Sequence, residues 1–276
     1  MKNARLIFKR SFGKAFSFVP KSNSRKIILL YHSVGDSPWS MRPEAFKEQM
    51  EWLKSNVHLT NLDSILNFNN EDNKKKNHIE VAVSFDDGYK SLVSNVLPIV
   101  KKLKIKPSVF INTSCIKENY SLRSDPNMGH YPCEIFMNWE DVRNLHQEGW
   151  IIGSHGCNHY DLTKLDSSVI DEELNLSKNI IEKNLNKSCI HFSYTFGKYN
   201  KNLLSKVINS GYKYCYTAIH KPIISGFNKY LIPRINIENV YSLNDFINII
   251  NGNWDYHSWK IFDLLKNFSR NIFRVQ

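Results

Sequence analysis

Short apolar runs alternate with amphipathic segments along almost the whole chain, and this alternation limits the possible folds more than any other feature. The runs have the length and the aliphatic content of buried strands, whereas the segments between them repeat apolar residues at helical spacing. Strands that alternate with helices form parallel sheets with crossover connections. We therefore predict an α/β protein, either a distorted (β/α) barrel of about seven to eight parallel strands or an open doubly wound sheet.

The predicted elements fill most of the chain. Strands are expected at residues 27–34, 58–60, 80–85, 107–112, 150–154, 189–194, 212–218 and 230–237. Helices are expected at residues 43–57, 62–68, 89–104, 138–148, 167–186, 201–209 and 243–250, and from residue 256 onward. Pro98 should kink or divide the third helix, because proline lacks a main-chain donor. Residues 69–78 are expected to be a polar linker, and the long loop at 113–137 is expected to be functional or mobile.

The composition restricts the partners and the location. We divide the 276 residues into a basic N-terminal extension (1–26), a main domain (27–252) and a basic amphipathic C-terminal helix (253–276). The formal net charge of +11 indicates an anionic partner, but no nucleic-acid motif is visible, so we expect an acidic polymer or lipid rather than nucleic acid. Five cysteines without a Cys-x-x-Cys pair indicate a reducing compartment. We expect neither a transmembrane helix nor a signal peptide, and a cytoplasmic location.

Polar residues suited to catalysis follow several predicted strands, at the carboxyl ends where parallel α/β folds build active sites. His32 ends the first strand, Asp86 and Asp87 end the third, and His155 ends the fifth. Two adjacent carboxylates can share a site here, because Gly88 lets the chain turn. One can hold a metal while the other moves a proton. The alternative is a polar turn in which an aspartate caps a helix.

His155 and His159 stand four residues apart just beyond a strand, so we expect them to close on a metal from a loop or a short turn. Two imidazoles and one carboxylate are a common ligand set for divalent metals, with positions left open for water and substrate. A histidine pair at this spacing is weakly specific by itself, but the neighbouring Asp-Asp-Gly favours a metal site. Cys157 lies between them and can ligate a soft metal, although a buried structural thiol is the commoner case.

These residues belong to longer motifs, which are Ser84-Phe85-Asp86-Asp87-Gly88, Ser154-His155-Gly156-Cys157-Asn158-His159 and Phe192-Ser193-Tyr194-Thr195-Phe196-Gly197. In this order they resemble the first, second and third motifs of the polysaccharide deacetylases (carbohydrate esterase family 4, the NodB homology domain). Two more segments, Leu30-Tyr31-His32 and Leu231-Ile232-Pro233-Arg234-Ile235, resemble those of a bacterial subgroup linked to surface-polysaccharide biosynthesis. The similarity spans roughly residues 27–250.

The resemblance implies a distorted (β/α) barrel that removes acetyl groups from a sugar, glycolipid or polysaccharide, with N-acetyl favoured over O-acetyl. It implies one divalent metal ion, with Zn²⁺ expected first and Co²⁺, Ni²⁺, Fe²⁺ or Mn²⁺ as alternatives. The implied metal ligands are Asp87, His155 and His159, and the implied general base is Asp86.

The resemblance also implies an oxyanion donor and a general acid. The backbone N–H of Phe196 is the implied oxyanion donor, and His32, on the Tyr-His strand of the subgroup, is the implied acid. The alternative for His32 is a core histidine that ends a strand. His220 and His191 are the fallback acids, although each fits a structural or solvent-facing role better.

The third motif departs from the family pattern at two positions. Ser193 stands where an arginine is common, and Thr195 stands where a proline is common. Loss of the proline loosens the turn that aims the Phe196 N–H. Loss of the arginine removes a partner that would orient Asp86. Arg234 is the candidate replacement, and the alternative is a surface arginine on a strand.

The sequence leaves two other functions open, and it also predicts where in the cell the protein acts. The altered third motif favours a non-catalytic glycan-binding protein, and a third hypothesis is an amidohydrolase acting on a small non-sugar amide. Aromatic residues near the rim, such as Trp39 and Tyr131, suit sugar faces better than a small amide. The basic and aromatic composition of residues 1–26 and 260–274 predicts peripheral contact with the anionic inner membrane face.

Overall fold

The computed structural model describes residues 6–7, 9–11, 24–68, 78–122 and 128–255. Within them, one eight-stranded sheet runs in the order β10-β1-β3-β4-β7-β8-β9, with β2 paired to β3, and all of its strand pairs are parallel. The strands are β1 (Ser24–Tyr31), β2 (His58–Thr60), β3 (His78–Phe85), β4 (Ser108–Ile111), β7 (Ile151–Ser154), β8 (His191–Ser193), β9 (Tyr214–Tyr216) and β10 (Ile235–Asn236). A separate antiparallel pair joins β5 (Ser121–Leu122) to β6 (Ile135–Phe136).

The sheet is strongly curled, and the segment before β10 connects its two edges. Tyr216 in the edge strand β9 forms a parallel bridge with Ile232. Three residues later the same segment pairs with β1 at the opposite edge. The prediction of a distorted (β/α) barrel is confirmed by this arrangement, and the open doubly wound alternative is wrong.

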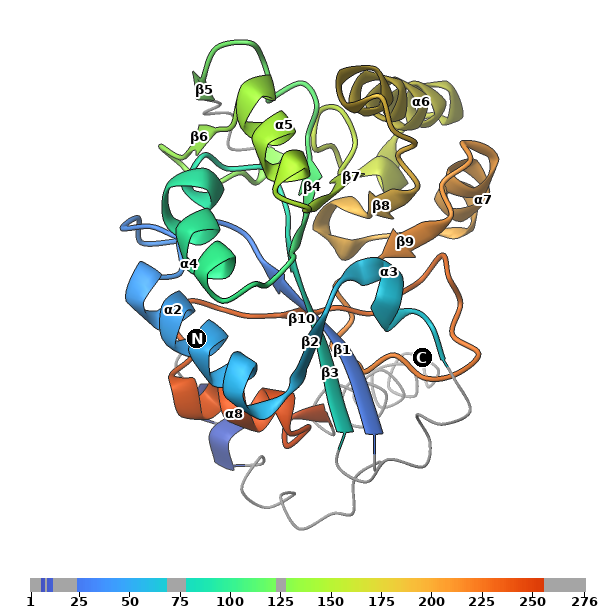
Figure 1. Cartoon of the computed structure of the whole chain (residues 1–276). Helices are drawn as coiled ribbons and strands as arrows, with labels where there is room; N and C mark the ends of the chain where they lie inside the picture. The colour runs from blue at the N-terminus through green and yellow to red at the C-terminus, as the bar shows by residue number, and fades with distance from the viewer. Residues whose placement is uncertain (1–5, 8, 12–23, 69–77, 123–127, 256–276) are drawn as a thin grey trace, which may run out of the picture.

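The helices surround the curled sheet, and all lie on its outside except the short one at residues 62–65, whose Leu62 and Ile65 belong to the same cluster as Phe110 (Figure 1). They are α2 (Pro43–Asn56), α3 (Leu62–Ile65), α4 (Leu97–Lys102), α5 (Trp139–Gln147), α6 (Ser167–Leu185), α7 (Lys201–Asn209) and α8 (Leu243–Ile250). Contacts join α8 to α2 and α2 to α4, and they also join α5 to α6 and α6 to α7. The predicted helix at 89–104 is divided, because a π-helical turn at Leu92–Val96 precedes α4 and Pro98 lies in the first turn of α4.

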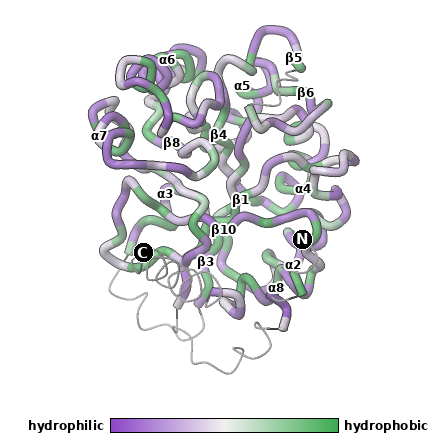
Figure 2. The backbone as a smooth tube through the Cα atoms, turned by 180° about the vertical axis from the view of Figure 1, so that it is seen from behind, coloured by the Kyte–Doolittle hydropathy of each residue, from purple (hydrophilic) through white to green (hydrophobic). Residues whose placement is uncertain are grey.

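Alternate residues of each central strand face two different hydrophobic clusters. Val81 and Val83 pack between the sheet and the helices, whereas Ala82 packs inside the curl with Phe110 and Tyr216. Figure 2 shows hydrophobic residues concentrated in the central strands. Because side chains alternate along a strand, residues 84 and 86 are directed into the curl, on the same side as residue 82.

Some boundaries differ from the predicted ones. The strand predicted at 230–237 is reduced to Ile235–Asn236, since Pro233 cannot donate to a ladder. The first strand begins at Ser24 and ends at Tyr31, so His32 lies just beyond it. The linker predicted at 69–78 lies almost entirely outside the described residues, as does the C-terminal helix predicted after 256. The proposed domain boundaries therefore stay predictions. Among the described helices, none has the length and apolar character needed to cross a membrane.

Candidate active site

A cavity of about 400 Å³ opens at the carboxyl ends of the strands and collects the residues singled out from the sequence. Its lining includes His32, Asp86, Asp87, His155, His159, Phe196 and Arg234. It also includes residues from the far ends of the described chain, among them Lys9, Glu238 and Tyr241. Parallel strands that end at one rim explain why residues so distant in sequence converge here.

Asp87, His155 and His159 form a buried cluster whose ligand atoms all lie within 4.8 Å of one another. The Oδ1 atom of Asp87 is 3.7 Å from Nε2 of His155 and 3.4 Å from Nε2 of His159. Main-chain carbonyls hold the other ring nitrogens: Nδ1 of His155 donates to Ser193 O at 2.8 Å, and Nδ1 of His159 donates to Met128 O. Both Nε2 atoms therefore face the carboxylate with their lone pairs.

The donor set fits a divalent metal ion. Oδ1 of Asp87 is buried and has no hydrogen-bond partner among the described residues. Burying an unpaired carboxylate oxygen costs free energy unless a cation binds it. Two imidazoles and one carboxylate are suitable ligands, and the cavity leaves room for water and substrate. The cluster can therefore hold one divalent metal ion.

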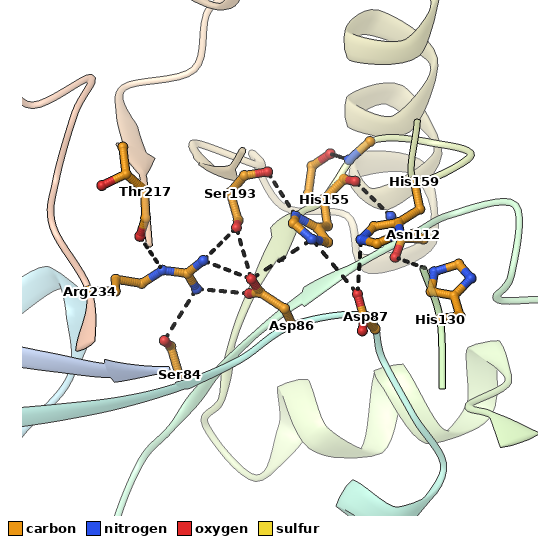
Figure 3. Close-up of polar contacts among 12 residues, drawn as sticks. Ser84, Asp86, Asp87, Asn112, His130, His155, His159, Ser193, Thr217 and Arg234 are labelled. Atoms are coloured by element: carbon orange, nitrogen blue, oxygen red, sulfur yellow. Dashed lines mark hydrogen bonds and ion pairs between the residues drawn. The ribbon is translucent and has the colours of Figure 1, made fainter. Parts of the chain in front are cut away.

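The backbone explains why two adjacent acids face different partners. Asp86 continues the ladder, because its N–H donates to Tyr31 O at 3.0 Å. Asp87 then has a φ of 75° and Gly88 a φ of 86°, so the chain turns sharply at the strand end. The left-handed conformation of Asp87 is unusual for a residue with a side chain. It turns this carboxylate toward the histidines, while the carboxylate of Asp86 points toward Arg234 (Figure 3).

Arg234 holds Asp86 with a bidentate contact in the interior of the barrel. Its Nη1 donates to Oδ1 at 2.8 Å and its Nη2 donates to Oδ2 at 2.7 Å. The other guanidinium N–H groups donate to Ser84 Oγ, Ser193 Oγ and Thr217 O, so all of the donors are used (Figure 3). Arg234 is fully buried, so the alternative of a surface arginine is wrong.

Ser193 also contacts Asp86, because its hydroxyl donates to Oδ2 at 3.1 Å. The same hydroxyl accepts from Nη2 of Arg234 at 2.7 Å. The serine at the usual arginine position therefore takes part in holding the carboxylate, as a small partner beside the guanidinium.

Charge and burial fix the protonation states of this site. Burial acts to raise the pKa of Asp86, but the Arg234 guanidinium outweighs it and lowers that pKa far below the ordinary value. The pKa of Asp87 is lowered as well, since the imidazoles of His159 and His32 outweigh the effect of burial. Burial lowers the pKa of His155 to about 4. At neutral pH both acids are therefore ionised and His155 is neutral, which is the state that a metal ligand requires.

The candidate acids lie in different places. His32 is half-buried and lines the cavity, with its ring centroid 5.8 Å from that of Tyr131. His220 also lines the cavity, and its Nε2 is 3.8 Å from Oδ1 of Asp255. His191 does not line the cavity, because it lies at the other end of β8, where its ring is hydrogen-bonded to Tyr216 and Asp63. The geometry therefore leaves His32 and His220 as the candidates for the general acid.

The turn after β8 is closed despite the missing proline. Gly197 N–H donates to Tyr194 O at 2.8 Å and Lys198 N–H donates to Thr195 O at 3.1 Å. Phe196 between them has a φ of 57°, and its ring is 4.7 Å from the ring of His159. These two hydrogen bonds close the turn, and its expected loosening stays a prediction. The role of the Phe196 N–H as an oxyanion donor stays a prediction.

The loop at residues 128–131 contributes contacts that the sequence did not indicate. Met128 supplies the carbonyl that orients His159. The His130 ring stacks on the His159 ring with centroids 4.4 Å apart. The Tyr131 N–H donates to the hydroxyl of Tyr89 at 2.8 Å. A main-chain carbonyl cannot be recognised in a sequence, so the contact of Met128 could not be predicted. The sequence indicated only that this long loop is functional or mobile and that Tyr131 lies near the rim.

The fold and the site define a hydrolase barrel that can hold one divalent metal ion beside a buried, ionised carboxylate. A family model described as polysaccharide deacetylase matches residues 73–215, just over half of the chain. The chain belongs to the polysaccharide deacetylase family, carbohydrate esterase family 4. Enzymes of this family carry out metal-dependent deacetylation of glycans.

Individual relatives agree with this assignment. A poly-beta-1,6-N-acetyl-D-glucosamine N-deacetylase of Staphylococcus aureus is 26% identical over 211 residues, which cover 73% of this chain and 69% of the relative. The deacetylase PplD of Streptococcus pyogenes, solved in complex with acetate, is similar in structure, with a TM-score of 0.67, 20% identity, and coverage of 82% of this chain and 98% of that one. IcaB from Ammonifex degensii gives a TM-score of 0.67 at 17% identity, with 85% and 98% covered. At these identities the structural likeness establishes the fold.

Proposed function

We propose that this protein is a metal-dependent deacetylase that removes N-acetyl groups, in preference to O-acetyl groups, from a sugar of a polysaccharide or glycolipid. One observation carries the proposal: the buried Asp87, His155 and His159 cluster shares a cavity with Asp86, whose carboxylate is fixed and ionised by Arg234. The preference for N-acetyl is supported by the Staphylococcus aureus relative, whose name gives an N-acetylglucosamine polymer as its substrate.

The residues of the cavity divide the proposed reaction among them. Asp87, His155 and His159 would hold a divalent metal ion, with Zn²⁺ as the first expectation, and this ion would supply Lewis-acid chemistry toward water and the acetyl carbonyl. Asp86 accepts the proton of the attacking water, and the bidentate contact with Arg234 keeps its carboxylate in one orientation. The Phe196 N–H donates to the oxygen on which negative charge develops. His32 donates a proton to the leaving amine.

Product release and metal content test this function together. The purified protein is incubated with Zn²⁺ and N-acetylglucosamine oligomers, and free amine and acetate are measured. We expect equal amounts of the two products, a loss of activity with a chelator, and recovery when Zn²⁺ is restored. Asp87→Ala should lose bound zinc as well as activity. Absence of acetate release from N- and O-acetylated glycans, with zinc bound, would exclude the deacetylase function.

The ground for a non-catalytic glycan-binding protein was the altered third motif, in which Ser193 and Thr195 replace the usual arginine and proline. Arg234 contacts Asp86 in the role expected of that arginine, which weakens this ground. A small non-sugar amide remains a substrate class for the assay to separate. The same reaction with a short aliphatic N-acetyl amine should be much slower than with the oligomers.

We also propose a cytoplasmic location with peripheral contact to the anionic inner membrane face. The net charge of +11 and the basic, aromatic ends of the sequence support it. The described basic residues near the N-terminus contact the protein itself, because Lys9 donates to the hydroxyl of Tyr241 and Arg10 donates to Asp245 at the start of α8. Sedimentation with anionic and zwitterionic vesicles tests the proposal. Binding should require the anionic lipid and fall as salt is raised.

A further inference from the structure

The two metal-binding histidines are carried by a loop that wraps around a buried carboxylate from a helix. Glu173 lies in the second turn of α6 and is 4% exposed. Its Oε2 accepts the main-chain N–H groups of Cys157 at 2.8 Å and Asn158 at 3.0 Å. Its Oε1 accepts the side-chain amide of Asn158 at 2.6 Å. All of these donors come from between His155 and His159.

The opposite side of the loop is held by the chain that follows β4. Asn112 donates its amide to His155 O at 2.6 Å, and Thr113 N–H donates to Gly156 O at 3.2 Å. Ser114 N–H donates to Cys157 O at 3.1 Å. Three carbonyls of the loop thus face residues 112–114, while the N–H groups of Cys157 and Asn158 face Glu173. With its donors and acceptors both engaged, the loop has one preferred backbone conformation.

The local backbone requires such support. Gly156 has a φ of 81°, and a Cβ atom there would lie 3.3 Å from Oε2 of Glu173. The glycine therefore permits both the turn and the close approach of the carboxylate. His159 has a φ of 59°, a left-handed conformation that a residue with a side chain adopts only where its surroundings impose it.

We propose that Glu173 is a positioning residue for the metal centre. It fixes the main chain between His155 and His159, so that the two Nε2 atoms converge on Oδ1 of Asp87. This inference rests on the proposed metal-dependent function, and it adds a residue outside the three sequence motifs. Partners that orient metal ligands typically contribute 10- to 100-fold to metal affinity.

The dissociation constant for Zn²⁺ tests the proposal without a substrate. It is measured on the full-length protein by competition with a chromophoric chelator. Glu173→Ala should raise this constant about 10- to 100-fold, because both loop N–H groups lose their acceptor. Glu173→Gln keeps an oxygen that can accept the same two N–H groups, so it should bind zinc within about threefold of the wild type.

The same helix offers a matched control. Glu182 also accepts a main-chain N–H, that of Cys189 at 2.9 Å, together with the ammonium group of Lys178 at 2.8 Å. These partners lie on α6 and before β8, away from the histidine loop. Glu182→Ala should lower thermal stability and leave the zinc dissociation constant unchanged.

The outcomes separate this inference from the proposed function. A folded Glu173→Ala protein with wild-type zinc affinity, or an equal loss in Glu182→Ala, overturns the positioning role alone. A wild-type protein that binds neither Zn²⁺ nor Co²⁺, Ni²⁺, Fe²⁺ or Mn²⁺ overturns the proposed function as well. If Glu173→Ala does not fold, Glu173→Asp decides: its carboxylate ends one methylene short of the loop, so an unchanged dissociation constant overturns the role.

Discussion

Replacing Arg234 by methionine leaves the Asp86 carboxylate buried without its counter-charge. The guanidinium is fully buried, so solvent does not screen its contact with Asp86. Breaking such a pair from one side typically costs about 3–5 kcal/mol. Since a domain has only about 5–15 kcal/mol of unfolding free energy, the loss should be plain in urea denaturation.

The same substitution should change how stability and activity depend on pH, and the direction of each change can be stated. In the wild type the pKa of Asp86 is lowered by Arg234, so its contribution to stability is present above the unfolded value near 3.9 and is lost only at more acid pH. In Arg234→Met the largest effect that lowers the pKa of Asp86 is removed, so burial, which raises this pKa, is opposed only by the smaller effects of His155 and His32. The variant should therefore gain stability relative to the wild type as the pH falls, and the acid limb of kcat/KM should move to higher pH.

A double-mutant cycle isolates the interaction. In the Arg234→Met background, Asp86→Asn removes the uncompensated charge and should restore most of the lost stability. Arg25→Met is the control, since it breaks a contact between another buried arginine and Asp255. It should leave the acid limb of kcat/KM in place. The reasoning is wrong if Arg234→Met keeps wild-type stability and the same acid limb, or if Asp86→Asn destabilises the two backgrounds equally.

Three further outcomes follow from the site. Asp86→Asn should lower kcat by about 10²–10⁴ with zinc content unchanged, and a normal turnover number would remove Asp86 as the base. His32→Ala should lower kcat for N-acetyl substrates more than for activated acetyl esters, whose leaving groups need no proton; equal losses would contradict the acid role. In metal-free protein, burial lowers the pKa of His155 to about 4. As the pH falls, His155 is therefore protonated in the unfolded chain before it is protonated in the folded protein. The free energy of unfolding should fall by about 3 kcal/mol between pH 6.5 and 4, and it should fall less in His155→Gln.

The sequence predicted the parts of this molecule that depend on local pattern. Apolar runs predicted the positions of the main strands, and the alternation of strand and helix predicted a parallel sheet, whereas its closure into a distorted barrel was implied by the family resemblance. Since parallel strands end at one rim, the pattern also placed His32, Asp87 and His155 at one cavity. The boundaries of β10 were predicted less accurately, because the segment before this strand forms a bridge with β9 and then pairs with β1.

What the sequence could not fix is the set of partners brought together across the barrel. For Asp86 the sequence offered Arg234, 148 residues away, as a partner but left a surface arginine as the alternative, because their contact depends on β10 joining the sheet beside β1 rather than beside β9. The carbonyl of Met128 depends on the path of a long loop. Glu173 appears in the sequence as one acid among several at the start of a helix, and only its burial distinguishes it.

The structure explains why a serine, rather than the arginine common in the family, stands at position 193. An arginine side chain at position 193 would project into the curl from β8, where Nη2 of Arg234 already lies 2.7 Å from Ser193 Oγ. Two guanidinium groups cannot share that buried volume with one carboxylate, since one positive charge would remain unpaired. A small hydroxyl at position 193 is therefore a condition for Arg234 to reach Asp86. The two positions act as one unit: the charge is supplied by the segment before β10, and the serine completes the hydrogen bonds around it.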